Sequence, residues 1–309
     1  MWSFESGMIT LAIPNRNGAR YLESTLRSLC SGSNRGVVRW WLQDCCSQDG
    51  SPDIAERYRS DRDVIRICPD TGQANGLNRA FAEMGGEIVG YLNSDDCLAE
   101  GAATAVCNAF ENNPEVDVVF GAVQWIDVEG RTTGHHQGMI VSFEEALDIY
   151  EFWWNSKQWV QPEVFFRRKL YDLVGGFDER FELSFDFDFW LRILRLRPVV
   201  MAIPQTVALF RRHNQQRSLD FEKANREIRL AVGRQLDDDT CPITPRFRAR
   251  VARMLRYDLY QNGSDLSPLS GLSFAKALLR SPDWVLLPEV RRRILSSVGT
   301  HLGKELRHS

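Results

Sequence analysis

Short apolar runs alternate with amphipathic segments through residues 8–120, and this alternation constrains the fold more than any other feature of the chain. The amphipathic segments carry apolar residues every three or four positions, the spacing of a helix with one buried face. Such alternation is typical of βαβ units, whose right-handed crossovers place the strands in one sheet. The predicted strands are 8–13, 37–42, 64–68, 87–92 and 116–120, and the predicted helices are 20–29, 52–59, 74–84 and 101–112. We therefore predict an α/β fold with a mostly parallel, Rossmann-like sheet flanked by helices.

The regular alternation stops after residue 120. Residues 122–138 predict a hairpin that turns around Asp127 to Gly130, and an aromatic-rich stretch follows up to residue 197. From about residue 220 the chain consists of Arg-rich helical segments interrupted by prolines. We predict a main domain over residues 1–217 and a C-terminal helical region over residues 218–309. A chain of 309 residues with 43% hydrophobic content is large enough for both.

Composition excludes several classes of function. The net charge is −3 and the isoelectric point is near 6.0, so nucleic acid is not expected as the main partner. The longest apolar runs are strand-sized, far short of the roughly 20 residues of a membrane span. The N-terminus carries Glu5 where a signal peptide has positive charge, and the seven cysteines lack Cys-x-x-Cys spacing. These features predict a cytoplasmic protein with free thiols.

Polar residues follow each of the first four predicted strands. They are Pro14-Asn15-Arg16-Asn17, Asp44, Asp70-Thr71-Gly72-Gln73 and Asn93-Ser94-Asp95-Asp96. Strands often end in turn-forming residues, which would explain any single end. Four polar ends in succession on one edge favour a ligand site, because ligands bind outside the carboxyl ends of parallel strands.

Two clusters of carboxylates carry the chemistry that the sequence suggests. Asp95 and Asp96 repel each other unless a cation lies beside them, and oxygen ligands suit Mg²⁺ or Mn²⁺ bound with a substrate phosphate. Asp96 could also cap the helix that follows it. Asp186 and Asp188 stand among large aromatic residues, where partial desolvation raises a carboxyl pKa and suits the group to general-base work. Acids that begin a helix would account for one of these two.

Seven segments resemble, in order, the motifs of family-2 glycosyltransferases of the GT-A fold, and the resemblance extends from about residue 9 to residue 214. They include counterparts of the family's opening strand, its Asp-x-Asp metal motif, its catalytic-base motif and its terminal histidine motif. The segments are residues 9–17, 41–51, 70–78, 91–96, 161–179, 186–192 and 210–213. Any one of these matches alone is weak evidence. Coincidence is a poor explanation for seven matches in the correct order.

The resemblance implies a metal-dependent, inverting hexosyltransferase and assigns residue roles. Asp186 would be the catalytic base, and Asp44 would accept a hydrogen bond from the nucleotide base. The implied metal ligands for Mn²⁺ or Mg²⁺ are Asp95, Asp96 and His213. The implied donor-binding residues are Pro14, Asn15, Arg16, Asp44, Asp70, Gly72, Gln73, Asn78, Asn93, Ser94 and Asp95. The implied acceptor-binding residues are Trp159, Gln161 and Glu163. Trp159 and the tryptophans before it could stack on a sugar face, but packing in the core or a lip at a membrane surface explains them at least as well.

The chain departs from the family pattern at several positions. Arg16 stands where an aromatic residue is frequent, and Cys45-Cys46 replaces a small, glycine-like pair. Asn93 replaces the first Asp of the metal motif but can still bond a ribose hydroxyl. Phe185 stands where an acid often precedes the base, which leaves Asp186 as the sole carboxylate at that point. These departures bear on the identity of the donor more than on the reaction.

The implied partners are a nucleotide-sugar donor, with a UDP-sugar favoured, and a glycan or lipid-linked acceptor in polysaccharide or other glycan assembly. Arginines near the C-terminus, at 291–293 and 307, are explained either by a solvated charge run, the commoner case, or by peripheral contact with anionic lipid at the inner face of the membrane. An inactive module that binds a nucleotide-sugar or glycan is the alternative function. A dinucleotide-dependent enzyme is disfavoured because no Gly-x-Gly-x-x-Gly motif follows a predicted strand. A sugar-nucleotide pyrophosphorylase is disfavoured because no glycine-rich, basic loop follows the first predicted strand.

Overall fold

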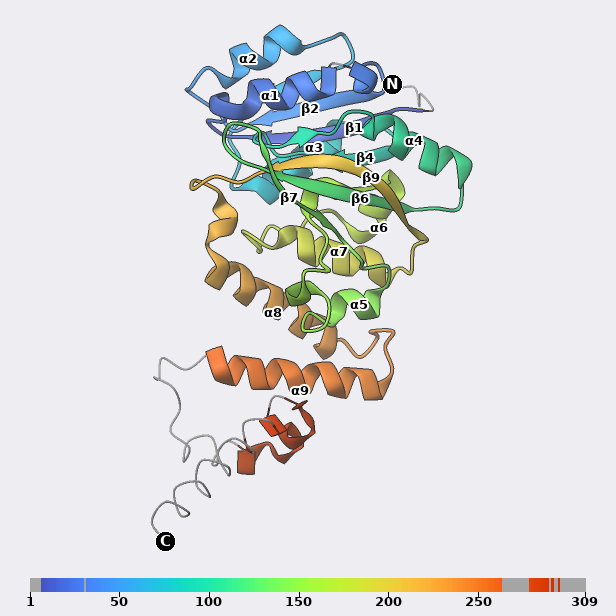
Figure 1. Cartoon of the computed structure of the whole chain (residues 1–309), viewed down its shortest axis with the longest axis vertical. Helices are drawn as coiled ribbons and strands as arrows, with labels where there is room; N and C mark the ends of the chain where they lie inside the picture. The colour runs from blue at the N-terminus through green and yellow to red at the C-terminus, as the bar shows by residue number, and fades with distance from the viewer. Residues whose placement is uncertain (1–6, 31, 263–277, 289, 292–293, 295–309) are drawn as a thin grey trace. The chain divides into compact units, whose positions relative to one another are not determined.

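The computed structural model describes residues 7–30, 32–262, 278–288, 290–291 and 294 (Figure 1). The chain forms two compact units, Met1–Ala231 and Val232–Ser309. Helix α8 (Phe221–Asp237) begins in the larger unit, so the first turns of this helix belong with the sheet domain. Of the C-terminal arginines considered above, Arg292, Arg293 and Arg307 lie outside the described residues.

The larger unit is built on one sheet whose first four strands are parallel. These strands are β1 (Ile9–Asn15), β2 (Val38–Asp44), β3 (Val64–Ile67) and β4 (Ile88–Tyr91). Among the described residues the sheet has nine strands in the order β3-β2-β1-β4-β8-β6-β9-β5, with β7 paired to β6. β1 lies between β2 and β4 and is parallel to both. The α/β prediction and its parallel strands are confirmed.

The second half of the sheet mixes strand directions. It contains β5 (Cys97–Leu98), β6 (Val118–Ile126), β7 (Thr132–Gln137), β8 (Val164–Arg167) and β9 (Val200–Arg211). β6 runs parallel to β9 but antiparallel to β8 and β7. The predicted hairpin is the β6–β7 pair, and its first arm continues the strand predicted at 116–120 instead of starting a new one. The periodicity did not predict β8, which pairs with β4 across the middle of the sheet.

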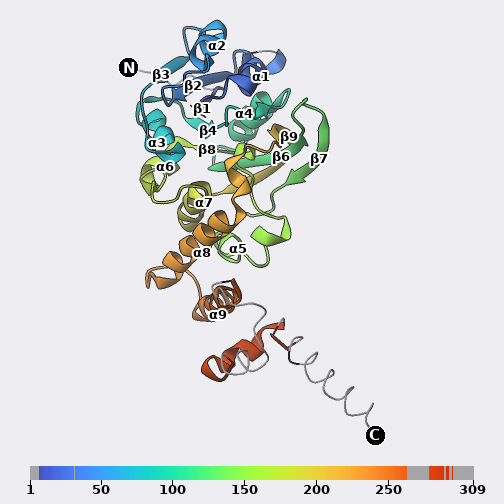
Figure 2. The ribbon, with the colours of Figure 1, turned by 90° about the vertical axis from the view of Figure 1, so that its left-hand side faces the viewer.

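Helices cover both faces of this sheet (Figures 1 and 2). On one face, α1 (Ala19–Cys30), α2 (Ser51–Tyr58) and α4 (Ala102–Asn112) contribute to an aliphatic core that includes Ile9, Leu11 and Ile13 of β1. On the other face, α3 (Gln73–Glu83), α6 (Arg168–Val174) and α7 (Phe185–Arg195) carry aromatic rings that stack with one another. A short helix, α5 (Phe143–Leu147), contacts α7. The amphipathic pattern of these segments thus reflects burial against a sheet face.

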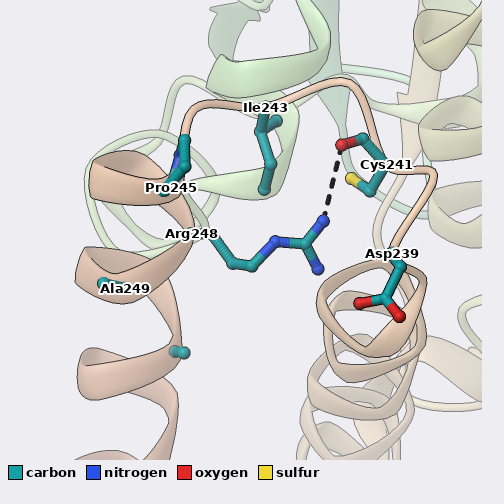
Figure 3. A pocket seen from close by; sticks show the side chains of 7 residues that line it. Asp239, Cys241, Ile243, Pro245, Arg248 and Ala249 are labelled. Carbon is teal, nitrogen blue, oxygen red and sulfur yellow. Dashed lines mark hydrogen bonds between the residues drawn. The ribbon is translucent and has the colours of Figure 1, made fainter.

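The smaller unit contains the remainder of α8 and helix α9 (Pro245–Asn262). Its core gathers Trp284, Leu287 and Val290, against which residues of α9 pack. An open cavity of about 490 Å³ lies between Asp239 and Ala252, and Figure 3 shows Arg248 directed toward the carbonyl oxygen of Cys241, at 3.4 Å. Within the described part of the chain, none of the helices combines the length and the apolar character needed to span a membrane.

Glycine at position 121 is required by the close approach of β6 and β9. A Cβ added there would lie 2.7 Å from the carbonyl oxygen of Gln205 and 2.5 Å from a methyl group of Val207. We expect Gly121→Ala to lower the free energy of unfolding by about 2 kcal/mol, because a packed core does not accept an extra methyl group. Gly233→Ala is the control: the site lies inside α8 with only ordinary contact to Leu255, so this change should stabilise by about 0.5 kcal/mol. Urea denaturation of both variants measures the difference, and equal effects would contradict the packing argument.

Candidate active site

The ends of β1 and β2 are joined by a buried amide–carboxylate pair. Asn15 Nδ2 donates to Asp44 Oδ2 at 2.6 Å, and the other Asp44 oxygen accepts from the Ser47 N–H at 2.7 Å. Both side chains are buried. The Oδ1 atom of Asn15 is buried and has no hydrogen-bond partner among the described residues. The structure therefore brings these two predicted donor residues together.

The loop after β2 contains one departure from the family pattern. Cys46 has a φ of 51°, in the left-handed region that favours glycine, at the place where the family has a small residue. The loop is held to the loop after β1, since the Asn17 N–H donates to Ser47 Oγ at 2.7 Å and the Ala19 N–H donates to Asp49 Oδ2 at 2.8 Å. Arg16, predicted to bind the donor, is exposed between these loops.

The ends of β3 and β4 meet at the N-terminus of α3. Asp70 Oδ1 accepts from the Gly72 N–H at 3.1 Å, and Gly72 is the residue that precedes the helix. Gln73 Nε2 donates to Asn93 Oδ1 at 2.8 Å, which links the first helical residue to the loop after β4. A helix N-terminus presents free N–H groups and positive potential, which suit a phosphate.

Asp95 and His213 form the central pair of the site. His213 Nε2 lies 2.9 Å from Asp95 Oδ2, although the residues are 118 positions apart. The Asp95 side chain is 28% exposed and that of His213 8% exposed, so the pair is at the base of an accessible surface. The imidazole also packs on Tyr21, with ring centroids 5.1 Å apart. The neighbouring Ser94 lies partly exposed beside this pair, and its carbonyl oxygen accepts from Thr25 Oγ1 at 3.0 Å.

Asp96 has a different environment from Asp95. It is buried, its Oδ1 accepts from the Arg211 N–H at 2.8 Å, and its Oδ2 accepts from Asn93 Nδ2 at 3.4 Å. Burial, with the neighbouring charge of Asp95, raises its pKa well above the usual range. The expectation that Asp96 caps the following helix is wrong, because α4 begins after Gly101. Its predicted role as a metal ligand stays a prediction, with both oxygens bonded within the protein.

Arg211 locks the ends of β4, β6 and β9 together. Its buried guanidinium donates to the carbonyl oxygens of Asp95 at 2.9 Å and Asp127 at 3.1 Å, and to Ser24 Oγ at 3.2 Å. It also lies over the Tyr21 ring, 4.8 Å from the centroid. This arginine was visible in the sequence only as a neighbour of His213. Its role arises from contacts with segments distant in the chain.

Asp186 lies in the first turn of α7. Burial raises its pKa to about 6, partly offset by a hydrogen bond from the Phe187 N–H, which lies 2.8 Å from Oδ1. The other acid of this segment, Asp188, pairs with Arg192 one turn further on, at 2.8 Å. Asp188 therefore has a structural role in the ion pair of α7. Among the described residues, Asp186 has no such ion pair to explain it and stays the candidate base.

Tyr91, the last residue of β4, connects Asp186 to the strand edge. Burial raises the pKa of the Tyr91 phenol, and the charges of Asp186 and Asp96 raise it further. The Tyr91 ring also lies 6.2 Å from that of Phe185, which precedes Asp186. The start of α7 and the end of β4 thus face the same region.

The structure places the predicted acceptor residues inside the protein. Trp159 is 2% exposed and packs against Phe120 and Trp190. Gln161 donates to the Tyr91 carbonyl oxygen. Glu163 is fully buried, where desolvation raises its pKa, and it accepts from the Val160 N–H at 2.8 Å. These three residues support the floor below the site, and their contact with an acceptor stays a prediction.

Asn78 is also engaged within the protein. Its Oδ1 accepts from Tyr171 Oη and from the Phe177 N–H, both at 2.9 Å, and its Nδ2 donates to the Phe177 carbonyl oxygen, also at 2.9 Å. It therefore joins α3 to the segment before α7. Its predicted role in donor binding is not tested by these contacts, which use both ends of the amide.

Asp95 and His213 are the two groups that fit a divalent metal. In the described part of the chain, no three His, Cys, Asp or Glu residues are grouped to hold a metal ion by themselves. A site for Mg²⁺ or Mn²⁺ needs fewer protein ligands, because such ions commonly take one or two carboxylates and complete their shell with substrate phosphate and water. The partly exposed Asp95 carboxylate, beside an imidazole and near the N-terminus of α3, fits this pattern.

The mostly parallel sheet flanked by helices is similar to the GT-A fold. The sequence profile of Glycosyl transferase family 2 matches residues 10–177, more than half of the chain. The chain therefore belongs to that family.

Relatives and solved structures agree with this assignment. An uncharacterized protein of Mycobacterium tuberculosis is 26% identical over 217 residues, 67% of each chain. A PGL/p-HBAD biosynthesis glycosyltransferase of Mycobacterium bovis is 27% identical over 190 residues, 60% of this chain and 69% of the relative.

Two solved structures share the fold at low sequence identity. TarS 1–349 of S. aureus in complex with UDP-GlcNAc has a TM-score of 0.61 and 17% identity, covering 90% of this chain and 78% of that one. The mannosyltransferase PcManGT of Pyrobaculum calidifontis, in complex with GDP-Man and Mn²⁺, has a TM-score of 0.56 and 17% identity, covering 94% of this chain and 86% of that one.

The neighbouring residues Arg211 and Arg212 provide a test of the lock at the strand ends. We expect Arg211→Lys to lower the free energy of unfolding by about 2 kcal/mol, since a lysine cannot reproduce the fork of buried hydrogen bonds. Arg212→Lys is the matched control, because Arg212 is exposed and lies over the Trp125 ring at 4.2 Å. Its effect should stay below about 0.5 kcal/mol. Chemical denaturation compares the two variants, and similar losses would contradict the proposed lock.

Proposed function

We propose that this chain transfers a sugar, with inversion, from a nucleotide-sugar donor to an acceptor hydroxyl, using Mn²⁺ or Mg²⁺. The single observation that carries the proposal is the geometry around Tyr91. Its ring lies 6.2 Å from that of Phe185, which precedes Asp186, and its strand leads directly into the Asn93–Asp96 loop, so the proposed base and the Asp95–His213 pair would face one region. Transfer requires both groups at one anomeric carbon.

The donor is proposed to occupy the edge formed by β1 to β4. Asn15 and Asp44 would meet the nucleotide base, and the unpartnered Asn15 Oδ1 supplies an acceptor there. Asp70, Gln73 and Asn93 would frame the ribose and diphosphate beside the N-terminus of α3. The TarS complex with UDP-GlcNAc and the PcManGT complex with GDP-Man support a nucleotide-sugar donor of this kind. We favour a UDP-sugar, on the resemblance of the Asp44 segment to the family's uracil-binding motif.

Asp95 and His213 would hold the metal together with the donor phosphates. A divalent ion bound there would neutralise charge that builds up on the departing diphosphate. The protein contributes the placement: Arg211 fixes the Asp95 backbone, and Tyr21 supports the imidazole. The PcManGT complex with Mn²⁺ supports the choice of ion.

Asp186 would act as the base. As the acceptor oxygen attacks the anomeric carbon from the side opposite the diphosphate, the Asp186 carboxylate removes the hydroxyl proton. Displacement from the opposite side inverts the configuration. A pKa of about 6 keeps Asp186 ionised at neutral pH and more basic than an ordinary aspartate.

We further propose a glycan or lipid-linked acceptor, a role in polysaccharide or other glycan assembly, and a cytoplasmic location with peripheral membrane contact through the C-terminal region. The biosynthesis glycosyltransferase of Mycobacterium bovis supports a role in glycan assembly. An inactive module that only binds a nucleotide-sugar or glycan is the alternative. The presence of Asp95, Asp186 and His213 together favours turnover.

Donor consumption by the wild type and by two site variants tests the proposal. Wild type, Asp186→Asn and Asp95→Ala are each incubated with Mn²⁺ and a panel of UDP-, GDP- and dTDP-sugars, and released nucleoside diphosphate is measured. We expect one donor to be consumed, with a loss of at least about a hundredfold in Asp186→Asn while donor affinity is kept. Asp95→Ala should lose metal-dependent donor binding. The control is Asp53→Asn, exposed on α2, which should match wild type. Metal-dependent binding without release from any donor would favour the inactive module.

The pH dependence of the reaction tests the base separately. Because the pKa of Asp186 is raised from 3.8 to about 6, its base form is lost as the pH falls through 6. We expect kcat/KM for transfer to be constant above about pH 7 and to fall tenfold per unit below about pH 6. A rate profile across pH 4.5–8.5 measures the acid limb. A limb near pH 4 would show that an unshifted carboxylate, and not Asp186, is the base.

A further inference from the structure

The carboxylate of Glu227, in α8, lies at the start of α7. Its Oε2 accepts from the backbone N–H of Leu183 at 2.8 Å and of Ser184 at 2.9 Å, and its Oε1 accepts from that of Glu182 at 3.1 Å. Three consecutive N–H groups therefore converge on one carboxylate. Glu227 is only 8% exposed.

This carboxylate holds the turn that leads into α7, where the N-cap residue makes no side-chain capping bond. Ser184 is the N-cap residue, yet its hydroxyl makes no capping bond and instead donates to the Ala224 carbonyl oxygen of α8 at 3.0 Å. Backbone N–H groups that lead into a helix need an acceptor, and a negative charge there is favoured by the helix dipole. Glu227 meets both requirements from a helix more than forty residues away. Asp186 follows two residues after Ser184, so the same bonds fix its backbone.

The surrounding contacts hold α8 to this loop and to the aromatic segment beside it. Glu182 forms ion pairs with Lys223 and with Arg217, the latter at 3.0 Å. Asn225 Oδ1 accepts from the indole N–H of Trp154 at 3.1 Å, and Arg229 lies over the same indole, 5.1 Å from its centroid. α8 thus contacts both segments. This part of α8 lies beyond the stretch that the family profile matches.

We propose that Glu227 is a positioning residue for the reaction: it holds the turn before α7 so that the Asp186 carboxylate is directed at the acceptor hydroxyl. The inference rests on the proposed function of Asp186 as the base. Loss of the three N–H bonds would allow the turn before Asp186 to move. Helix α8, which is not part of the sheet, would therefore affect the rate of the reaction. A displacement of about 1 Å at such a group commonly costs up to a hundredfold in rate.

The charged or titratable groups near Asp186 belong to α8, β4 and α7. Glu227 approaches from α8 and Tyr91 from β4, while on α7 itself Asp188 is paired with Arg192. The negative charge of Glu227 disfavours ionisation of Asp186 and raises its pKa beyond the effect of burial. Removing that charge therefore lowers the pKa of Asp186.

The test compares Glu227→Gln with Glu182→Gln and wild type, using the donor consumed in the activity screen. Glutamine keeps an oxygen that accepts from the backbone but lacks the charge. We expect kcat for Glu227→Gln to fall about tenfold with the donor KM unchanged, because the donor edge is not touched. The acid limb of kcat should move to lower pH, because the charge that helps to raise the pKa of Asp186 is removed. Glu182→Gln removes an exposed ion-paired carboxylate from the same loop and should stay within about twofold of wild type.

Thermal melting and Asp186→Asn complete the experiment. If Glu227→Gln matches wild type in kcat and in its acid limb, or loses activity and melting temperature with the limb unmoved, the positioning role is overturned. Retention of wild-type activity by Asp186→Asn would instead overturn the proposed function on which the inference rests. Loss of kcat together with a shifted limb, in a variant that melts within about 5 °C of wild type, supports the inference.

Discussion

Parallel pairing of β2, β1 and β4 is the constraint on which the rest of the structure depends. Parallel strands end on the same edge, so the residues that follow them are brought together whatever their separation in the chain. In this protein those residues are polar and their side chains bond to one another, as Asn15 does to Asp44 and Gln73 to Asn93. The edge is therefore preorganised before any ligand arrives.

The carboxylates gathered at this edge are separated by environment. Asp96 is buried and bonded to the β9 backbone, which leaves Asp95 as the accessible member of an adjacent pair. Arg211 offsets the local negative charge and ties three strand ends together. Asp186 stands on another element, in a buried turn that raises its pKa. The proposed metal-binding carboxylate, Asp95, and the proposed base, Asp186, therefore occupy different environments.

Much of the fold was predictable because its signals are local. The four parallel strands and the helices between them begin and end within about two residues of their predicted positions, since burial on one face imposes a short sequence period. β8 was missed because its pairing with β4 and β6 is set by segments that are distant in the chain. The proposed helix-capping role of Asp96 was wrong for a related reason: the two-residue strand β5 intervenes before α4.

The sequence by itself determined the α/β fold, the polar strand ends and the candidate base, because periodicity and residue type express local burial and chemistry. Tertiary structure decided which of these groups meet. The Asp95–His213 contact joins residues 118 positions apart, and the Glu227 cap reaches Ser184 across 43 positions. Tertiary structure also placed Trp159 and Glu163 in the core. No local pattern encodes such contacts, because they depend on how the sheet and helices pack in three dimensions.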